Sequence, residues 1–286
     1  MSSPIQLAWS MLAQLQRREI QALAETIGVQ PIFLKAVWAD EVLFNGTGSR
    51  SGGDIDVLIA PDRFREFAKV LTGAGYSRVR VASHKVTSDI GDKEWLFRKA
   101  GAFLPIDLHR GLSEHFPSAT KPFLQRVKEY PAANGSIWSL VEEDQVLYCV
   151  MHYMGHRFEL DERHLADISA LAAKHPLDWD VIRRRAEGLS LQIPMALLVE
   201  ALRNRGASAP PPQTFAVGRR LESRLAWARS WIAVDQGFSR VNRSEAKWQL
   251  YLDLLYRFPR LKAKPLDSVR TAVKYVGLRI ADVLIR

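Results

Sequence analysis

Apolar residues recur at two different periods along the chain, and the change of period separates two kinds of secondary structure. The first forty residues have helical spacing, with a break at Gly28. Short apolar runs then alternate with a helical pattern over residues 61–76, where Phe64, Phe67, Ala68 and Leu71 fall on one face. The runs that read as short apolar segments or strands are residues 42–46, 54–60, 76–86, 93–100 and 103–111.

Beyond about Ser136 the strand signals stop and an apolar helical stripe recurs between polar or Gly/Pro breaks. The helical stretches expected there are residues 142–158, 161–175, 177–190, 193–206, 243–258 and 266–284, with a Pro-rich loop at 207–215. The pattern therefore predicts an α/β domain over residues 1–135 and an all-helical domain over 136–286.

Composition restricts the classes of protein that fit this pattern. The chain has 286 residues, 47% of them hydrophobic and 25% charged, as in an ordinary globular protein. No apolar run of about 18 residues occurs, so no membrane span is expected. The N-terminus reads as an amphipathic helix rather than a signal peptide, and Cys149 alone excludes an internal disulfide; both features favour the cytoplasm.

Positive charge is concentrated near the C-terminus. The formal net charge is +9, and residues 240–286 hold eleven Lys or Arg against four Asp or Glu. A basic surface of this kind attracts nucleic acid or another acidic partner. The other interpretation is a solvated basic helix face, and the sequence leaves both open.

Two acids at the start of an apolar strand are the first candidate chemistry. Asp54 and Asp56 open the run "DIDVLIA" and, at i and i+2 of a strand, point to the same side. Such a pair binds a divalent cation, acts as an acid/base pair, or hydrogen-bonds loop amides and a nearby Arg. Asp107, in the later strand "LPIDLH", completes a three-carboxylate cluster if the two strands are neighbours. A cation would relieve the repulsion within such a cluster.

The loop before these acids is rich in glycine and serine. The stretch "NGTGSRSGG" can bring backbone N–H groups close to phosphate oxygens. Arg50 within it either binds phosphate or pairs with Asp54 or Asp56. His109 shares a strand face with Asp107 and either meets a substrate or packs in the core.

This order of motifs resembles the DNA polymerase β-like nucleotidyltransferase superfamily, and within it a bacterial family of nucleotidyltransferases. The resemblance rests on "RSGGDIDVLIAPD", "GAGY", "PIDLH" and "RHLADISALAAKHPLDWDVI" and covers roughly residues 40–205. It implies an α+β fold: a small mixed β-sheet flanked by helices, followed by an all-helical C-terminal domain that closes a nucleotide cleft.

The resemblance also implies site residues and an activity. Asp54, Asp56 and Asp107 would bind Mg²⁺, with Mn²⁺ as a second candidate, and Asp107 would activate the acceptor hydroxyl. Gly46, Thr47, Gly48 and Ser49 would line the phosphate loop, with Arg50 and His109 as further nucleotide contacts. A nucleoside monophosphate would pass from an NTP such as ATP to a hydroxyl on a small molecule, a protein or an RNA end, with release of pyrophosphate.

The short Gly/Ser loop fits one alternative function. Only six residues separate Gly46-Thr47 from Asp54, where the superfamily usually has a longer spacer. A catalytically degenerate nucleotidyltransferase fold that senses nucleotides or binds a protein also fits this short loop.

Overall fold

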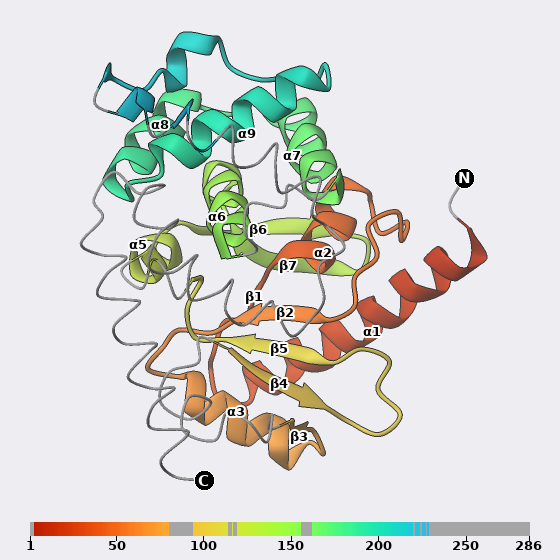
Figure 1. Cartoon of the computed structure of the whole chain (residues 1–286). Helices are drawn as coiled ribbons and strands as arrows, with labels where there is room; N and C mark the ends of the chain where they lie inside the picture. Colours follow the sequence, from red (N-terminus) through yellow and green to blue (C-terminus); the bar gives the residue numbers. More distant parts are fainter. Residues whose placement is uncertain are drawn as a thin grey trace, which may run out of the picture. The chain divides into compact units, whose positions relative to one another are not determined.

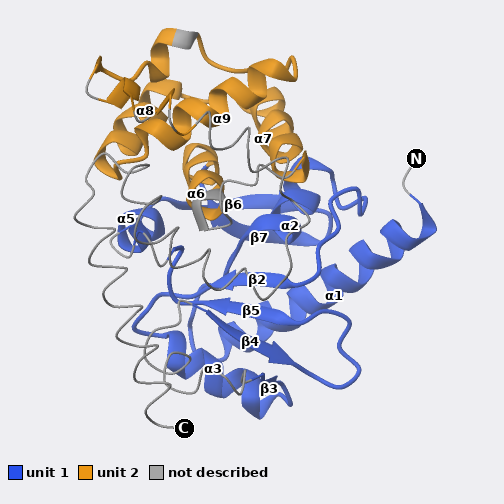
Figure 2. Cartoon of the chain, viewed as in Figure 1, with its two compact units in different colours: residues 1–141, 282–286 blue, residues 142–281 orange. Residues whose placement is uncertain are grey.

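The structure is a computed structural model in which residues 3–79, 94–113, 116, 119–155, 162–219, 221–223, 225–226 and 228 are described. The described residues up to Val141 belong to one compact unit and those from Glu142 to a second (Figure 2). The predicted basic segment, residues 240–286, lies outside the described residues, as do both of its helical stretches.

The first unit is built on a five-stranded mixed sheet with strand order β1-β2-β5-β4-β3. The strands are β1 (Ile32–Phe33), β2 (Ile55–Leu58), β3 (Ser77–Arg78), β4 (Glu94–Arg98) and β5 (Ile106–His109). Only β2 and β5 run parallel; the other neighbouring pairs are antiparallel. The predicted α+β class with a small mixed sheet is thus confirmed (Figure 1).

The two faces of this sheet differ in chemistry because side chains alternate along each strand. One face carries apolar side chains that are fully or almost fully buried, namely Ile55, Val57, Phe97, Ile106 and Leu108. Trp95 shares that face and packs edge-on against Phe64 of helix α3 (Phe64–Gly73), with ring centroids 4.9 Å apart. The opposite face carries the acids.

Helix α3 follows the predicted pattern. Phe64, Phe67, Ala68 and Leu71 are all buried, as the i, i+3, i+4, i+7 spacing requires.

Helix α1 (Pro4–Glu25) begins with a capping box between Ser3 and Gln6. The stretch after Gly28, expected to be helical, begins with the short strand β1. It is helical from Lys35 on, as the short helix α2 (Lys35–Trp38) followed by a π-helix, Ala39–Leu43. Residues 42–46, grouped with the strand signals, are therefore the end of the π-helix and a turn, not a strand.

A β-hairpin that the pattern did not predict ends the first unit. Strands β6 (Val127–Ala132) and β7 (Gly135–Leu140) pair antiparallel after the short helix α5 (Thr120–Leu124). The Ser139 hydroxyl donates a hydrogen bond to the Phe33 carbonyl of β1. Strand structure thus continues to Leu140, past Ser136, where the pattern predicts the last strand signal.

The second unit is helical throughout its described part, as predicted. Its helices are α6 (Glu142–Gly155), α7 (Glu162–Lys174), α8 (Trp179–Gly188) and α9 (Gln192–Asn204), with a short 3₁₀ turn at Pro212–Phe215. Asp178 caps α8 by accepting a hydrogen bond from the Val181 N–H at 2.9 Å. Within the described residues, no helix is both long and apolar enough to cross a bilayer.

Candidate active site

The parallel pairing of β2 and β5 brings the predicted acids together. Asp56 lies opposite Asp107 in the register, and Leu58 lies opposite His109. Because neighbouring strands are about 5 Å apart, side chains at paired positions on one face are in reach of each other. The expectation that Asp107 lies beside the "DIDVLI" strand is confirmed.

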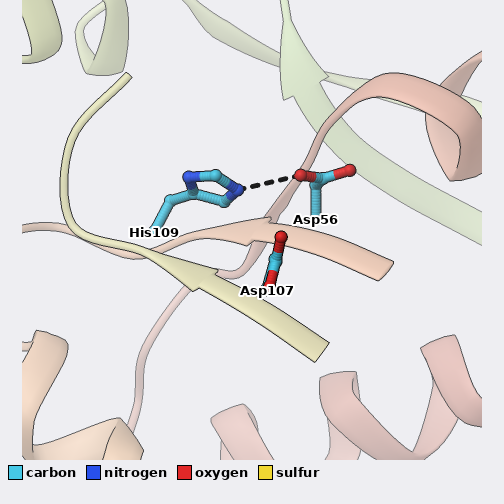
Figure 3. A group of neighbouring side chains, drawn as sticks. All are labelled: Asp56, Asp107 and His109. Carbon is cyan, nitrogen blue, oxygen red and sulfur yellow. Dashed lines mark hydrogen bonds and ion pairs between the residues drawn. The ribbon is translucent and has the colours of Figure 1, made fainter. Parts of the chain in front are cut away.

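Asp56 is the most enclosed of the three acids, at 1% exposure. Its Oδ1 accepts a hydrogen bond from Lys35 Nζ at 2.6 Å and lies 2.9 Å from His109 Nε2 (Figure 3). Burial by itself would raise the pKa of Asp56, but the Lys35 ammonium and the His109 hydrogen bond lower that pKa well below its usual range. Asp56 is therefore a carboxylate at every physiological pH.

Asp54 and Asp107 are half-buried, and their pKa values are raised, whereas that of Asp56 is lowered. Asp54 immediately precedes β2. Burial and the Asp56 charge raise the pKa of Asp54, and the charge of Lys35 and a side-chain hydrogen bond with Asp107 partly offset this. Burial, together with the charges of Glu94, Asp56 and Asp54, raises the pKa of Asp107 to about 6. The cluster thus carries more negative charge than its surroundings neutralise.

The donor atoms suit a divalent cation. One ligand atom each from Asp56, Asp107 and His109 lies within 4.8 Å of the other two, and Figure 3 shows the three side chains on the same side of the two strands. Asp54, at the entrance to β2, adds a further carboxylate beside Asp107. Carboxylate oxygens are the ligands that Mg²⁺ and Mn²⁺ prefer, so the residues present fit such an ion.

Two residues of this site were not expected from the sequence. Lys35 lies 21 positions before Asp56, and nothing in the local pattern points its ammonium at that acid. Glu94 opens β4 opposite His109, and its Oε2 is 3.2 Å from His109 Nδ1. Glu94 had a usable signal, because the antiparallel pairing of two strands joined by a Gly101 turn fixes which residues face each other.

The Gly/Ser loop, residues 45–53, folds around an internal carboxylate. Asp40 is buried, and its side chain accepts hydrogen bonds from the Ser10 hydroxyl at 2.7 Å, from the Arg50 N–H at 3.3 Å and from the Gly48 N–H. The Gly46 N–H donates to the Asp40 carbonyl at 2.7 Å. Three amides of the predicted phosphate loop thus bind Asp40 in this structure.

The remaining groups of the loop lie differently. Thr47 and Ser49 are exposed, and their hydroxyl oxygens are 2.8 Å apart. Arg50 is 7% exposed, and its Nη1 donates to the Ser51 carbonyl at 3.1 Å. The loop therefore presents hydroxyls outward and holds its guanidinium close to its own backbone.

Gly48 is the position at which this loop is least tolerant of a side chain. Its φ is +73°, and a Cβ there would lie 1.8 Å from the Gln6 carbonyl oxygen of α1. We expect Gly48→Ala to lower the free energy of unfolding by about 1–3 kcal/mol, through overpacking and an unfavourable backbone conformation. Chemical denaturation measures this. Gly53→Ala is the matched control, since no atom lies within 4 Å of its Cβ, and equal losses for both variants would contradict the packing seen here.

One comparison with known proteins shows a family. A family model described as "Uncharacterised nucleotidyltransferase" matches residues 8–204. No curated protein matches the chain.

Several solved structures resemble the chain at low identity, among them the following three. A lincomycin-bound lincosamide antibiotic adenylyltransferase has 17% identity and a TM-score of 0.39, over 54% of this chain and 92% of its own. The solution structure of the antibiotic-resistance factor ANT(2'')-Ia has 13% identity and a TM-score of 0.43, over 69% of this chain and 92% of its own. An antigenic nucleotidyltransferase-like protein from Paracoccidioides brasiliensis has 15% identity and a TM-score of 0.43, over 74% of this chain and 98% of its own. None of these likenesses bears on the acceptor used by this chain.

The family model is the comparison that decides the identity. It spans well over half of the chain, from within α1 to the end of α9, and includes β2, β5 and the loop before them. This protein belongs to the nucleotidyltransferase family described by that model.

Proposed function

We propose that the chain transfers a nucleoside monophosphate from an NTP to a hydroxyl-bearing acceptor, with Mg²⁺ or Mn²⁺ as the metal. The observation that carries this proposal is the convergence of Asp54, Asp56 and Asp107, which the parallel pairing of β2 and β5 brings to one face of the sheet. Nothing in the packing of the sheet requires three acids there, and their mutual repulsion opposes folding.

The proposed reaction forms a bond between the acceptor oxygen and the α-phosphorus and breaks the bond from that phosphorus to the pyrophosphate oxygen. A bound Mg²⁺ supplies charge neutralisation for the phosphates and the developing negative charge. Asp54, Asp56 and Asp107 would hold the ion. Asp107 would also take the proton of the acceptor hydroxyl.

For the nucleotide, we assign the phosphate contacts to the outer side of the Gly/Ser loop. The exposed Thr47 and Ser49 hydroxyls are suitable donors to phosphate oxygens. Gly46, Gly48 and Arg50 keep the loop in shape through Asp40 and Ser51. In this proposal the two hydroxyls contact the phosphates, while those three residues act mainly by positioning them.

The test is pyrophosphate release by the full chain with each of the four NTPs, in Mg²⁺ and in EDTA, with the intact mass of chain and acceptors as a second readout. We expect Mg²⁺-dependent release that Asp54→Asn lowers at least about a hundredfold, because one ligand charge is lost. Asp62→Asn, an exposed acid just after β2, is the control and retains wild-type activity. Equal rates for Asp54→Asn and wild type with every NTP would contradict the proposal.

A second candidate function is favoured by the internal carboxylate of the loop. Because Asp40 takes amides that would otherwise face a phosphate, the fold also suits a module that senses nucleotides or binds a protein without catalysis. Calorimetry separates the two functions: NTP binding that requires Mg²⁺ supports the enzyme, and binding that ignores Mg²⁺, or no binding, supports the module.

The setting of this activity follows from the sequence. We propose a cytoplasmic, bacterial enzyme, consistent with Cys149 as the single cysteine. The basic residues between 240 and 286 are proposed to attract a nucleic acid or another acidic partner. Binding that weakens steeply with salt supports such a partner.

A further inference from the structure

Lys35 reaches the acid cluster from a strained backbone position. It opens α2 with φ at +48°, a left-handed conformation that is strained for a non-glycine residue. The preceding residue is fixed to the sheet, since the Leu34 N–H donates to the Asp56 carbonyl at 3.0 Å. The strained turn therefore carries the lysine side chain back over β2, toward the side chain of the same aspartate.

The ammonium of Lys35 occupies one side of the Asp56 carboxylate. Its Nζ is 2.6 Å from Oδ1, and His109 Nε2 is 2.9 Å from the same oxygen. A carboxylate oxygen has about two lone-pair positions, so these two donors fill Oδ1. A metal ion that approaches Asp56 must then use Oδ2.

Two metal ions in this cluster would need a carboxylate that binds both of them. In two-metal sites the ions lie about 3.5–4 Å apart and share carboxylates as bridging ligands. Asp56 is the central acid here, opposite Asp107 in the register, so a bridging role would fall to it. Because Lys35 and His109 both contact Oδ1, Asp56 would have only Oδ2 for a metal ion.

We propose that Lys35 is a built-in cation of this site, so that the chain binds a single divalent ion, held by Asp54, Asp107 and Oδ2 of Asp56. The inference deepens the proposed function and rests on it for the role of the ion. The site would hold one ammonium and one metal ion, whereas a two-metal site holds two metal ions.

The test counts bound Mn²⁺ on the full chain by electron paramagnetic resonance, with and without an α,β-methylene NTP analogue. Wild type is expected to bind one Mn²⁺ per chain under both conditions. Lys35→Met removes the ammonium but keeps much of the side-chain volume, and we expect it to bind two Mn²⁺ with the analogue present. Lys35→Arg keeps the charge and is expected to bind one.

The controls separate this inference from the proposed function and from misfolding. Lys69→Met, an exposed lysine on α3, is the matched neutral substitution and is expected to bind one Mn²⁺. Far-UV circular dichroism establishes that each variant is folded, and the wild-type count needs no variant. Two Mn²⁺ or none on wild type, or one on a folded Lys35→Met, overturns the inference. Because counting needs no turnover, a single Mn²⁺ on a chain that transfers no nucleotide supports the inference while the proposed function fails.

Discussion

Replacing Asp107 by Asn is expected to stabilise the metal-free protein and, in the same variant, to lower nucleotidyl transfer at least about a thousandfold. The stability gain follows from charge: burial and the repulsion from Glu94, Asp56 and Asp54 raise the pKa of Asp107 to about 6. Ionising Asp107 at pH 8 therefore destabilises the folded state by about 1–3 kcal/mol. Asn does not ionise, so the variant avoids this cost. The activity loss follows because Asn cannot accept the hydroxyl proton and is a weaker ligand for Mg²⁺.

The contribution of Asp107 to the free energy of unfolding falls as the pH rises. Between the unfolded pKa, near 3.8, and about 6, the folded state binds more protons at Asp107 than the unfolded state does. The contribution of this group to stability is thus lost as the pH rises through that window. In EDTA, the difference in unfolding free energy between Asp107→Asn and wild type should grow from about pH 4 to about pH 7 and then level off.

Thermal and urea unfolding in EDTA measure the stability difference, and pyrophosphate release measures the activity. Asp62→Asn changes an exposed acid and serves as the control for charge in general. Added Mg²⁺ should raise the melting temperature of wild type and leave that of Asp107→Asn nearly unchanged. A variant that is both less stable in EDTA and as active as wild type would show that the cluster is not under electrostatic strain.

The convergence of the three acids was predictable because it depends on short-range rules. Alternation along a strand places Asp54 and Asp56 on the same side, and a single central acid marks β5. Helix α3 between them follows from an i, i+3, i+4, i+7 stripe that leaves few alternatives. These features survive in any fold that makes β2 and β5 neighbours.

The cation beside Asp56 was not predictable, since it depends on a long-range contact and a rare backbone conformation. The stretch from Pro31 to Glu41 has helical spacing, but its first residues pair with β2 and Lys35 adopts a positive φ. Tertiary pairing thus overrode the local pattern. The anchoring of the loop by Asp40 is hidden for the same reason, because its partners come from α1 and from residues 46–50.

The missed hairpin had a signal that could have been used. Ala133 and Asn134 form the turn between β6 and β7, and Gly135 opens β7 opposite Ala132. The dipeptide Asn134-Gly135, between two alternating runs, is a strong hairpin indicator in a sequence. Gly135 has φ at +99°, a backbone conformation that glycine adopts without strain. Reading this dipeptide would have extended the strand region beyond Ser136.

The second large effect is expected at Arg17, which is fully buried where α1 meets the π-helix and the β6–β7 turn. Its Nε is 3.3 Å from Glu41 Oε1, and its guanidinium donates to the carbonyls of Ser136 at 3.0 Å and Asn134 at 3.2 Å. Glu41 in turn accepts a hydrogen bond from the Ala133 N–H at 3.1 Å. One buried ion pair therefore ties three elements together, and Glu41 adjoins Asp40, which anchors the Gly/Ser loop.

We expect Arg17→Ala to lower the free energy of unfolding by about 3–5 kcal/mol, because it leaves the Glu41 charge buried without its partner. Urea denaturation measures the loss, with Arg18→Ala, an exposed neighbour, as the control at about 0.5 kcal/mol or less. Adding Glu41→Ala should recover part of the loss, because the unpaired buried charge is then gone. If the double variant loses the sum of the two single losses, the pair is not coupled, and the destabilisation comes from the cavity alone. A coupling of 1 kcal/mol or more would instead identify the buried pair as the link that holds α1, and with it the loop, against the sheet that carries the acids.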